Sequence, residues 1–363
     1  MTINIVQKYN GRSLYSMKKL REVAAHIASL RGQYENMVIV VGNMGQSTGD
    51  LIAMAKEAGQ DIPKRELEVL LAAGEQQSAS LLAIALSDMG VEAESMMGCK
   101  REIVAHPYFA DEYANVKEIN TERVQEIISA GKVAVVAGFQ GIDETKDIID
   151  LGRGGSDITA VGIAAHFGWD CEFYTTAECM YTADPQMYPE ARPIKAITYE
   201  EMMELANLGS DKLETRSVEL AKKYDVKLFL GKALERDKSK GTYIMNNNDN
   251  LLVEDMPITG ISIQEDVTIF TLRNIKNDGK TVAECFRLLG ELDINVDMIS
   301  QQNTGEDTCS VSFSCTHQQG VELKKQIEAA EAFKGVTVDC QEELAMISLV
   351  GVGMATHSGV ASE

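Results

Sequence analysis

Residues 151–160 read LGRGGSDITA, and their types suit the binding of an anion. Gly154 and Gly155 remove side chains where a ligand approaches the backbone, or where the chain takes a positive φ. Ser156 and Asp157 are good caps for the helix that the following residues predict. The stretch therefore predicts a glycine turn that leads into a capped helix.

The chemistry of such a turn favours phosphate or carboxylate. A helix N-terminus collects free N–H groups and partial positive charge. The Arg153 guanidinium adds a planar fork that can hold either anion at two points. A tight, well-capped turn with a surface arginine is the alternative interpretation, and the local sequence alone leaves both open.

Strands alternate with helices around this turn. Apolar runs that predict buried strands occupy residues 3–7, 37–41, 133–138, 171–174 and 226–230. The alternation predicts an α/β fold, with a mainly parallel sheet and helices on both faces. Ligands bind such sheets at the carboxyl ends of the strands. Lys8, Thr48 and Arg153 all follow predicted strands, so we expect them to converge at that edge.

A long helix is predicted over residues 64–88, and the tripeptide Gly74-Glu75-Gln76 falls inside it. Glycine in a helix costs about 1 kcal/mol relative to alanine. Gly74 therefore predicts close packing, or the approach of a ligand, at that point.

Composition limits the classes of partner. The net charge is −21, from 34 basic and 55 acidic residues, which argues against non-specific binding to nucleic acid or to anionic membranes. There is no run of about 18 apolar residues and no charged-then-apolar leader, so we expect a cytoplasmic protein. The seven cysteines form no CxxC pair, so neither a disulfide framework nor a resident metal site is predicted.

The sequence predicts two domains, 1–245 and 250–363, with the boundary at a polar run of asparagines and aspartate. Beyond it, strands at 267–273, 294–300, 308–315 and 336–340 alternate with helices at 280–292 and 318–330. This order predicts a small β-α-β-β-α-β unit. Residues 348–363 repeat the pattern of 271–284, so we expect one complete unit and the truncated start of a second.

Several motifs along the chain occur in an order that resembles the aspartate kinases of the amino-acid kinase superfamily. They are Lys8 after the first strand, Arg65-Glu66-Leu67, Gly74-Glu75-Gln76, Leu151–Asp157, Tyr181–Pro185, Arg216–Glu219 and Gly351–Met354. The resemblance implies an amino-acid kinase fold over 1–245 and a ferredoxin-like ACT regulatory region over 250–363. It implies transfer of the γ-phosphate of Mg-ATP to the β-carboxylate of L-aspartate, the first step of lysine, threonine and methionine biosynthesis.

The resemblance also implies roles for single residues. Lys8 would neutralise phosphate charge, and Asp157 would lie beside the reacting groups. The residues expected to hold aspartate are Thr48, Glu75, Arg153 and Ser156, with Glu75 at its ammonium and Arg153 at a carboxylate. The residues expected at the nucleotide are Lys8, Gly11, Gly154, Gly155, Thr175, Tyr181 and Asp184. The ACT region implies a homo-oligomer and an amino-acid effector.

The chain departs from the family at several of these motifs. Asn10 replaces a glycine of the first turn, and we expect it to take the positive φ that asparagine tolerates. The loop at 41–48 reads Val-Gly-Asn-Met-Gly-Gln-Ser-Thr where the family has Val-Ser-Ala-Met-Ser-Gly-Glu-Thr. Thr176 replaces a nucleotide-site aspartate. Asp211 occupies a lysine position, and Lys212 follows one residue, or about 100° of helix, later.

Loss of a lysine that stabilises the transferring phosphate would cost about 3–4 kcal/mol. The departures therefore leave an alternative open, a catalytically weak or inactive paralogue that binds an amino acid or a partner protein and acts as a regulator. A kinase of the same fold with another acceptor is a third option. Retention of Lys8, Glu75, Arg153 and Asp157 favours an active aspartate kinase.

Overall fold

The protein forms two compact units, Met1–Ile261 with Leu349–Glu363, and Ser262–Ser348. The computed structural model describes residues 3–44, 48–97, 103–107, 114–208, 212–246, 258–292, 294, 296, 298–305, 307–329 and 333–351, and side chains at 103–107 and 114–118 are not included. The chain leaves the first unit after Ile261, later than the boundary predicted near residue 250, and residues 247–257 lie outside this description.

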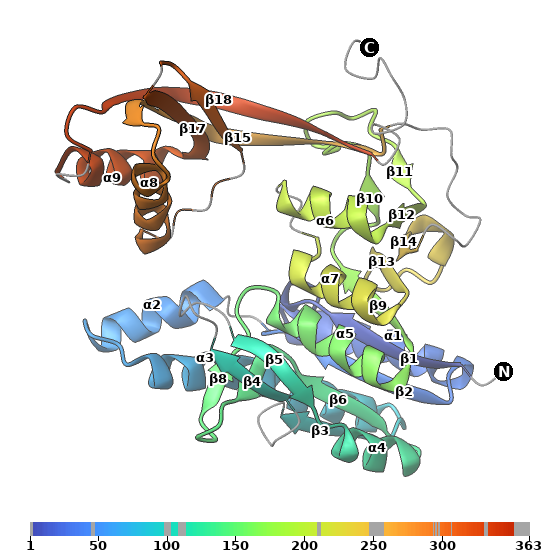
Figure 1. Cartoon of the computed structure of the whole chain (residues 1–363). Coiled ribbons are helices and arrows are strands. Elements are labelled where there is room, and N and C mark those ends of the chain that lie inside the picture. The colour runs from blue at the N-terminus through green and yellow to red at the C-terminus, as the bar shows by residue number, and fades with distance from the viewer. Residues whose placement is uncertain are drawn as a thin grey trace. The chain divides into compact units, whose positions relative to one another are not determined.

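An eight-stranded sheet organises the first unit (Figure 1), in the order β12-β14-β13-β9-β1-β2-β6-β3. The strands are β1 Asn4–Tyr9, β2 Asn36–Val41, β3 Ala93–Met97, β6 Val133–Ala137, β9 Asp170–Thr175, β12 Ala196–Thr198, β13 Leu228–Lys232 and β14 Thr242–Met245. All neighbours are parallel except β13 and β14. This confirms the predicted α/β fold with a mainly parallel sheet.

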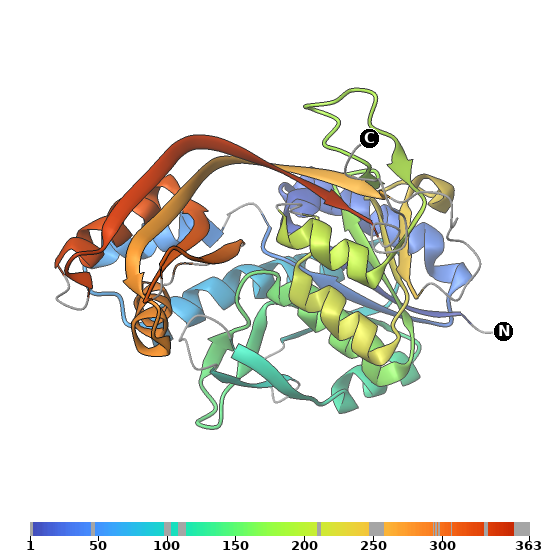
Figure 2. The same ribbon diagram turned by 45° about the horizontal axis from the view of Figure 1, so that its top comes forward.

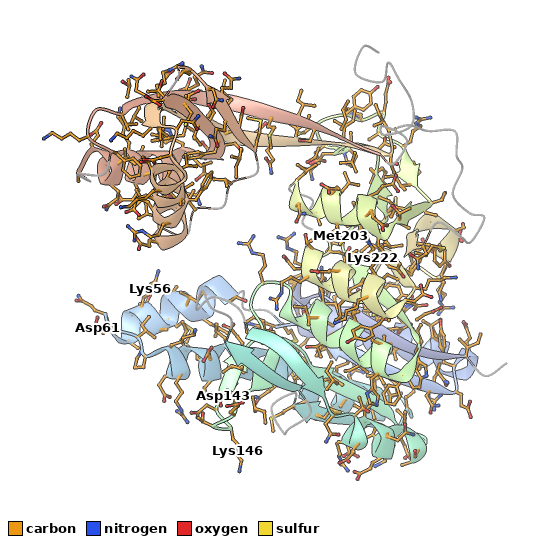
Figure 3. The ribbon with its side chains drawn as sticks, viewed as in Figure 1. Lys56, Asp61, Asp143, Lys146, Met203 and Lys222 are labelled. Atoms are coloured by element: carbon orange, nitrogen blue, oxygen red, sulfur yellow. The ribbon has the colours of Figure 1, made fainter. Side chains whose placement is uncertain are left out.

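Both faces of the sheet are buried along its five central strands, which explains why these strands contain apolar runs. Val6, Val38 and Val40 point into a core with the helices α4 Glu122–Ser129, α5 Gly155–Phe167, α6 Tyr199–Asn207 and α7 Thr215–Tyr224. Ile5 and Ile39 point into the opposite core with α1 Met17–Leu30 and α3 Lys64–Asp88. Figure 3 labels Met203 on α6 and Lys222 on α7. An ion pair joins these two helices, with the Lys222 Nζ 2.7 Å from the Glu200 Oε1.

Helix α3 follows α2 Thr48–Ala58 and spans the residues predicted for it. By length and composition it could cross a membrane, since its most apolar 18-residue window has a mean hydropathy of 1.3. Of that window, 56% is buried inside the protein. This burial is the property of a core helix in a globular domain.

Smaller elements complete the first unit. A second sheet has the order β5-β4-β7-β8, and β10 pairs with β11. Their bounds are β4 Ile103–Pro107, β5 Ala114–Ile119, β7 Gln140–Ile142, β8 Ile148–Asp150, β10 Met180–Tyr181 and β11 Pro193–Ile194, and short 3₁₀ helices cover Gly11–Leu14, Arg31–Gln33 and Lys238–Lys240. Figure 3 labels Asp143 and Lys146 in the turn between β7 and β8.

The second unit has the predicted β-α-β-β-α-β order, and β15 and β18 run side by side (Figure 2). Its elements are β15 Gly260–Lys276, α8 Gly279–Glu291, β16 Ile299–Asn303, β17 Thr308–Thr316, α9 His317–Ala329 and β18 Thr337–Val350. The first two residues of β15 and the last two of β18 belong to the first unit. The sheet order is β16-β17-β15-β18, and Phe270 and Phe313 stack in its core with ring centroids 5.4 Å apart. Strand β16 begins at Ile299 rather than at the predicted residue 294.

The chain returns to the first unit at its last described residues. Val350 is buried in the core beside α6, and its carbonyl accepts a hydrogen bond of 2.7 Å from the Thr259 N–H. The repeat predicted at 348–363 runs into residues 352–363, which lie outside the described residues.

Candidate functional site

The carboxyl ends of the central strands bring three loops to one edge of the sheet. The Gly42 N–H donates to the Tyr9 carbonyl at 3.2 Å, and the Gly138 N–H donates to the Val41 carbonyl at 3.1 Å. The loops after β1, β2 and β6 therefore lie next to each other. This is the edge at which parallel α/β sheets bind ligands.

Glycines allow these loops to meet the N-terminus of α5. A Cβ added to Gly11 would lie 2.1 Å from the carbonyl oxygen of Asn43, and one added to Gly138 would lie 2.6 Å from the Cβ of Ser156. Such distances are too short for real side chains, so both positions require glycine. Gly11 and Ser156, both predicted site residues, consequently lie in the same region.

The turn before α5 differs in one respect from the prediction. Gly154 is the N-cap residue, with a φ of 67°, and no side chain caps the helix. Ser156 and Asp157 therefore do not cap α5 but lie in its first turn. The left-handed Gly154 moves the helix start two residues earlier than the cap preference of serine and aspartate suggests.

Asp157 instead forms an ion pair with Lys8. The Lys8 Nζ lies 2.5 Å from the Asp157 Oδ1, and the two side chains are 9% and 10% exposed. Lys8 comes from β1 and Asp157 from α5, so the pair joins the first strand to the glycine turn. A charge pair removed from water in this way has strong electrostatic effects on whatever binds beside it.

The Asn10 turn also differs from the prediction. Asn10 has a φ of −73°, so it does not take a positive φ. Its side-chain oxygen instead accepts from the Ser13 N–H at 2.9 Å and from the Ser13 hydroxyl at 2.7 Å. The side chain stabilises the turn that a glycine would otherwise permit.

Glu75 is buried on α3 beside the loop that follows β2. Its Oε1 accepts a hydrogen bond of 3.1 Å from the Asn43 N–H, whereas its Oε2 has no hydrogen-bond partner in the described part of the protein. Burial raises the pKa of Glu75 to about 8, and the hydrogen bond from Asn43 and the charge of Lys8 oppose this rise. A buried carboxylate with one unpaired oxygen is suited to a cationic ligand.

Gly74 explains how the loop approaches α3 so closely. A Cβ at this position would lie 2.5 Å from the Cγ of Asn43. The prediction of close packing at this mid-helix glycine is therefore confirmed.

Arg153 and Thr48 lie at the exposed ends of their segments. Arg153 is exposed in the glycine turn, and Thr48 is exposed as the first residue of α2, after residues 45–47, which are not described. Glu214, the residue before α7, packs over the turn: a Cβ on Gly154 would lie 2.3 Å from its Cβ. Burial raises the pKa of Glu214, and the nearby positive charge of Arg153 opposes this. Convergence of Thr48 and Arg153 on Lys8 stays a prediction.

Three of the residues predicted at the nucleotide, Thr175, Tyr181 and Asp184, lie at the end of β9 or after it. The Thr175 hydroxyl accepts from the Ala177 N–H at 3.0 Å, and the Thr175 carbonyl accepts from the Ala233 N–H at 2.8 Å, so the loops after β9 and β13 adjoin. Tyr181 lies in β10, where burial raises its pKa to about 12. Asp184 is exposed and its carboxylate accepts a backbone N–H within a turn. The replaced aspartate position, Thr176, is exposed in the same loop.

Comparison with known proteins shows the family to which the chain belongs. Residues 4–232 match the amino acid kinase family. The aspartokinase of Bacillus sp. strain MGA3 is 36% identical over 364 residues, covering 99% of this chain and 86% of the relative. The chain belongs to the aspartokinases of the amino acid kinase family. The aspartokinase of Corynebacterium glutamicum is 35% identical over 366 residues, with the same coverage of 99% and 86%.

The fold of the family is shared as well. The crystal structure of E. coli aspartokinase III in complex with aspartate and ADP superposes with a TM-score of 0.80 at 20% identity, covering 99% of this chain and 90% of that one. The resemblance drawn from the sequence motifs is therefore confirmed.

Three residues near the family's glycine turn were missed by the sequence analysis as functional candidates: Asn43, Glu214 and Arg216. The Arg216 Nη1 donates to the Leu151 carbonyl at 3.0 Å, which holds the turn against α7. Arg216 belongs to a motif that supported the resemblance, and that motif was the available signal. The replaced lysine position, Asp211, lies outside the described residues.

Proposed function

We propose that this chain is an aspartate kinase, which transfers the γ-phosphate of Mg-ATP to the β-carboxylate of L-aspartate and forms 4-phospho-L-aspartate. The buried Lys8–Asp157 ion pair beside the glycine turn is the observation that carries the proposal. Membership of the aspartokinases and the buried carboxylate of Glu75 support the choice of acceptor.

Phosphoryl transfer depends on positioning and charge neutralisation more than on covalent chemistry. Asp157 orients the Lys8 ammonium, which presents its remaining donors to the transferring phosphate. Ser156 and the backbone of Gly11, Gly154 and Gly155 line the same edge. Lys8 supplies positive charge where negative charge moves during the reaction, in a site partly closed to water.

Aspartate is held by groups that recognise its charges. Glu75, once ionised, pairs with the substrate ammonium, and Arg153 pairs with a carboxylate. Thr48 contributes a hydroxyl at the start of α2. On the nucleotide side, Thr175 at the end of β9 and Tyr181 and Asp184 after it contact the nucleotide. This division leaves the β-carboxylate between the ammonium site and Lys8.

The test measures ADP release with Mg-ATP, in the presence and absence of L-aspartate, for the wild type and for Arg153→Ala. Arg273→Ala serves as the control, because Arg273 is an exposed arginine of the second unit, 3.0 Å from Asp339. Loss of a hydrogen-bonded charge pair with the substrate raises the KM for aspartate about 10-fold to 100-fold in Arg153→Ala. Aspartate-independent ADP release in the wild type would refute the proposal.

We also propose that the second unit is an ACT-type regulatory region that binds an amino-acid effector and joins two copies of this cytoplasmic protein. Its β-α-β-β-α-β order and its sheet order β16-β17-β15-β18 support this. E. coli aspartokinase III, a protein of the same fold, has been crystallised with lysine and aspartate. Sedimentation and ADP-release assays with added lysine or threonine test the assignment, and a monomer insensitive to both amino acids would contradict it.

A further inference from the structure

Asn43 connects the two halves of the candidate site. Its carbonyl oxygen lies against Gly11 in the turn after β1, and its N–H donates to the Glu75 carboxylate on α3 at 3.1 Å. One residue thus touches both the turn beside Lys8 and the group that faces the substrate ammonium.

The side chain of Asn43 is held in a fixed place. A Cβ on Gly74 would lie 2.5 Å from its Cγ and 2.6 Å from both its Nδ2 and its Oδ1, so only glycine at this point of α3 leaves room for the amide. The amide therefore packs directly on the helix backbone, one residue before Glu75.

Two buried polar atoms at this place lack a partner. Across the described residues, neither the Nδ2 of Asn43 nor the Oε2 of Glu75 has a hydrogen-bond partner. Buried polar groups are nearly always paired, so an unpaired one calls for an explanation such as a ligand or a bound water. Here a donor and an acceptor are unpaired on adjacent groups, one of them anionic when ionised.

An α-amino acid matches this pair. Its ammonium satisfies the acceptor and its carboxylate satisfies the donor. We infer that Asn43 is a substrate-specificity residue, whose side-chain amide donates to a carboxylate of the amino acid that Glu75 holds by its ammonium. The inference rests on the proposed function. The aspartate kinase loop quoted above has alanine at this position, so the contact is a feature of this chain.

The test compares L-aspartate with succinate, which has the same two carboxylates and no ammonium. Asn43→Ala raises the Kd and the KM for L-aspartate about 10-fold to 100-fold, because a hydrogen bond to a charged group is lost. It weakens competitive inhibition by succinate by the same factor and leaves the KM for ATP unchanged. Glu75→Gln weakens L-aspartate binding and leaves succinate inhibition unchanged.

Asn36→Ala is the matched control, since Asn36 lies at the other end of β2 and donates to Asn4 at 3.0 Å. Asn43→Asp keeps the shape of the side chain and replaces its donor by an acceptor. It therefore weakens the binding of L-aspartate at least as much as Asn43→Ala does. If the alanine variant does not fold, Asn43→Asp is the variant that tests the inference.

Three outcomes overturn the inference. Unchanged L-aspartate affinity in Asn43→Ala and Asn43→Asp would mean that the amide contacts only water. Loss of L-aspartate affinity with unchanged succinate inhibition would mean that Asn43 acts through Glu75. Equal losses for L-aspartate and ATP would mean that the loop has collapsed.

The proposed function fails separately. If the wild type binds L-aspartate in calorimetry without phosphorylating it, the kinase proposal is wrong, and the Asn43 effect on the Kd still decides the inference. If the wild type does not bind L-aspartate, both are wrong.

Discussion

At the scale of single residues, the Lys8–Asp157 ion pair allows the most direct test. Lys8→Met removes the cation and leaves the Asp157 carboxylate buried without its partner. We expect kcat to fall by about 10²–10³, the loss typical of one electrostatic group in the transition state. Stability falls too, by about 3–5 kcal/mol, because the remaining charge is uncompensated.

Lys132→Met is the control for this experiment. Lys132 lies 3.2 Å from Glu94, and both side chains are about one-third exposed, at 36% and 32%. Exposed pairs of this kind contribute about 0–1 kcal/mol. Steady-state kinetics give kcat and urea unfolding gives the free energy of unfolding for both variants. If kcat falls equally in the two variants, Lys8 has no role in the reaction.

Glu75 gives a prediction for pH. Burial raises its pKa from 4.5 in the unfolded chain to about 8 in the folded protein. Between these values the unfolded chain loses the proton and the folded protein keeps it, so the free energy of unfolding contributed by Glu75 falls as pH rises. In Glu75→Gln this contribution is absent.

Urea unfolding at pH 5 and pH 8 measures the effect, as the difference between wild type and Glu75→Gln. The wild type should lose more stability than the variant over this interval. Binding of L-aspartate near pH 7 should release the proton of Glu75, because the substrate ammonium favours the ionised form of the Glu75 carboxylate. Identical pH dependence in the two proteins would show that Glu75 is already ionised at pH 5.

At the scale of elements, the two glycines at the ends of α5 allow the cost of backbone strain to be measured separately from the cost of a steric clash. Gly154 and Gly168 flank the helix with φ values of 67° and 65°, and a Cβ on Gly168 would meet nothing within 4 Å. We expect Gly168→Ala to cost about 1–2 kcal/mol from the left-handed conformation alone. Gly154→Ala should cost more and should reduce kcat, because its Cβ would displace Glu214 and α7.

Thermal unfolding and kinetics of the two alanine variants test this. Glu214→Gly combined with Gly154→Ala should recover part of the extra loss, since the Glu214 Cβ that lies 2.3 Å from the added Cβ is then absent. If Gly154→Ala and Gly168→Ala lose equal stability, α7 moves away from the added Cβ at no cost in free energy.

The elements show what sequence can predict. The five central strands of the main sheet, β13, β9, β1, β2 and β6, were predictable because both of their faces are buried, so that each contains an apolar run. The outer strands β3, β12 and β14 were missed because they are short and carry no such run. The start of α5 was not, because the left-handed Gly154 overrides the cap preference of Ser156 and Asp157. Asn43 was missed because its role depends on Gly74 and Glu75, which are more than 30 residues away in the chain.

At the scale of the whole molecule, the chain leaves the first unit after Ile261 and returns to it at Leu349. The two ends of this excursion are adjacent, since Thr259 donates to Val350 at 2.7 Å within the first unit. Replacing residues 262–348 by a short glycine-serine linker therefore closes a small loop, which costs little entropy. We expect the first unit to remain folded.

Circular dichroism and ADP release check the deletion variant. It should melt cooperatively, retain aspartate-dependent turnover, and lose any response to an amino-acid effector. Failure to fold would show that the first unit depends on the second, and a retained effector response would place the effector site in the first unit.

The account as a whole depends on the acyl phosphate. The decisive measurement incubates the purified chain with Mg-ATP, L-aspartate and hydroxylamine, and identifies the trapped product by mass spectrometry. We predict the β-hydroxamate of aspartate, formed by the wild type and reduced by about 10²–10³ in Lys8→Met. Absence of the hydroxamate from the wild type, or equal amounts from the wild type and Lys8→Met, would contradict an aspartate kinase built around the Lys8–Asp157 pair.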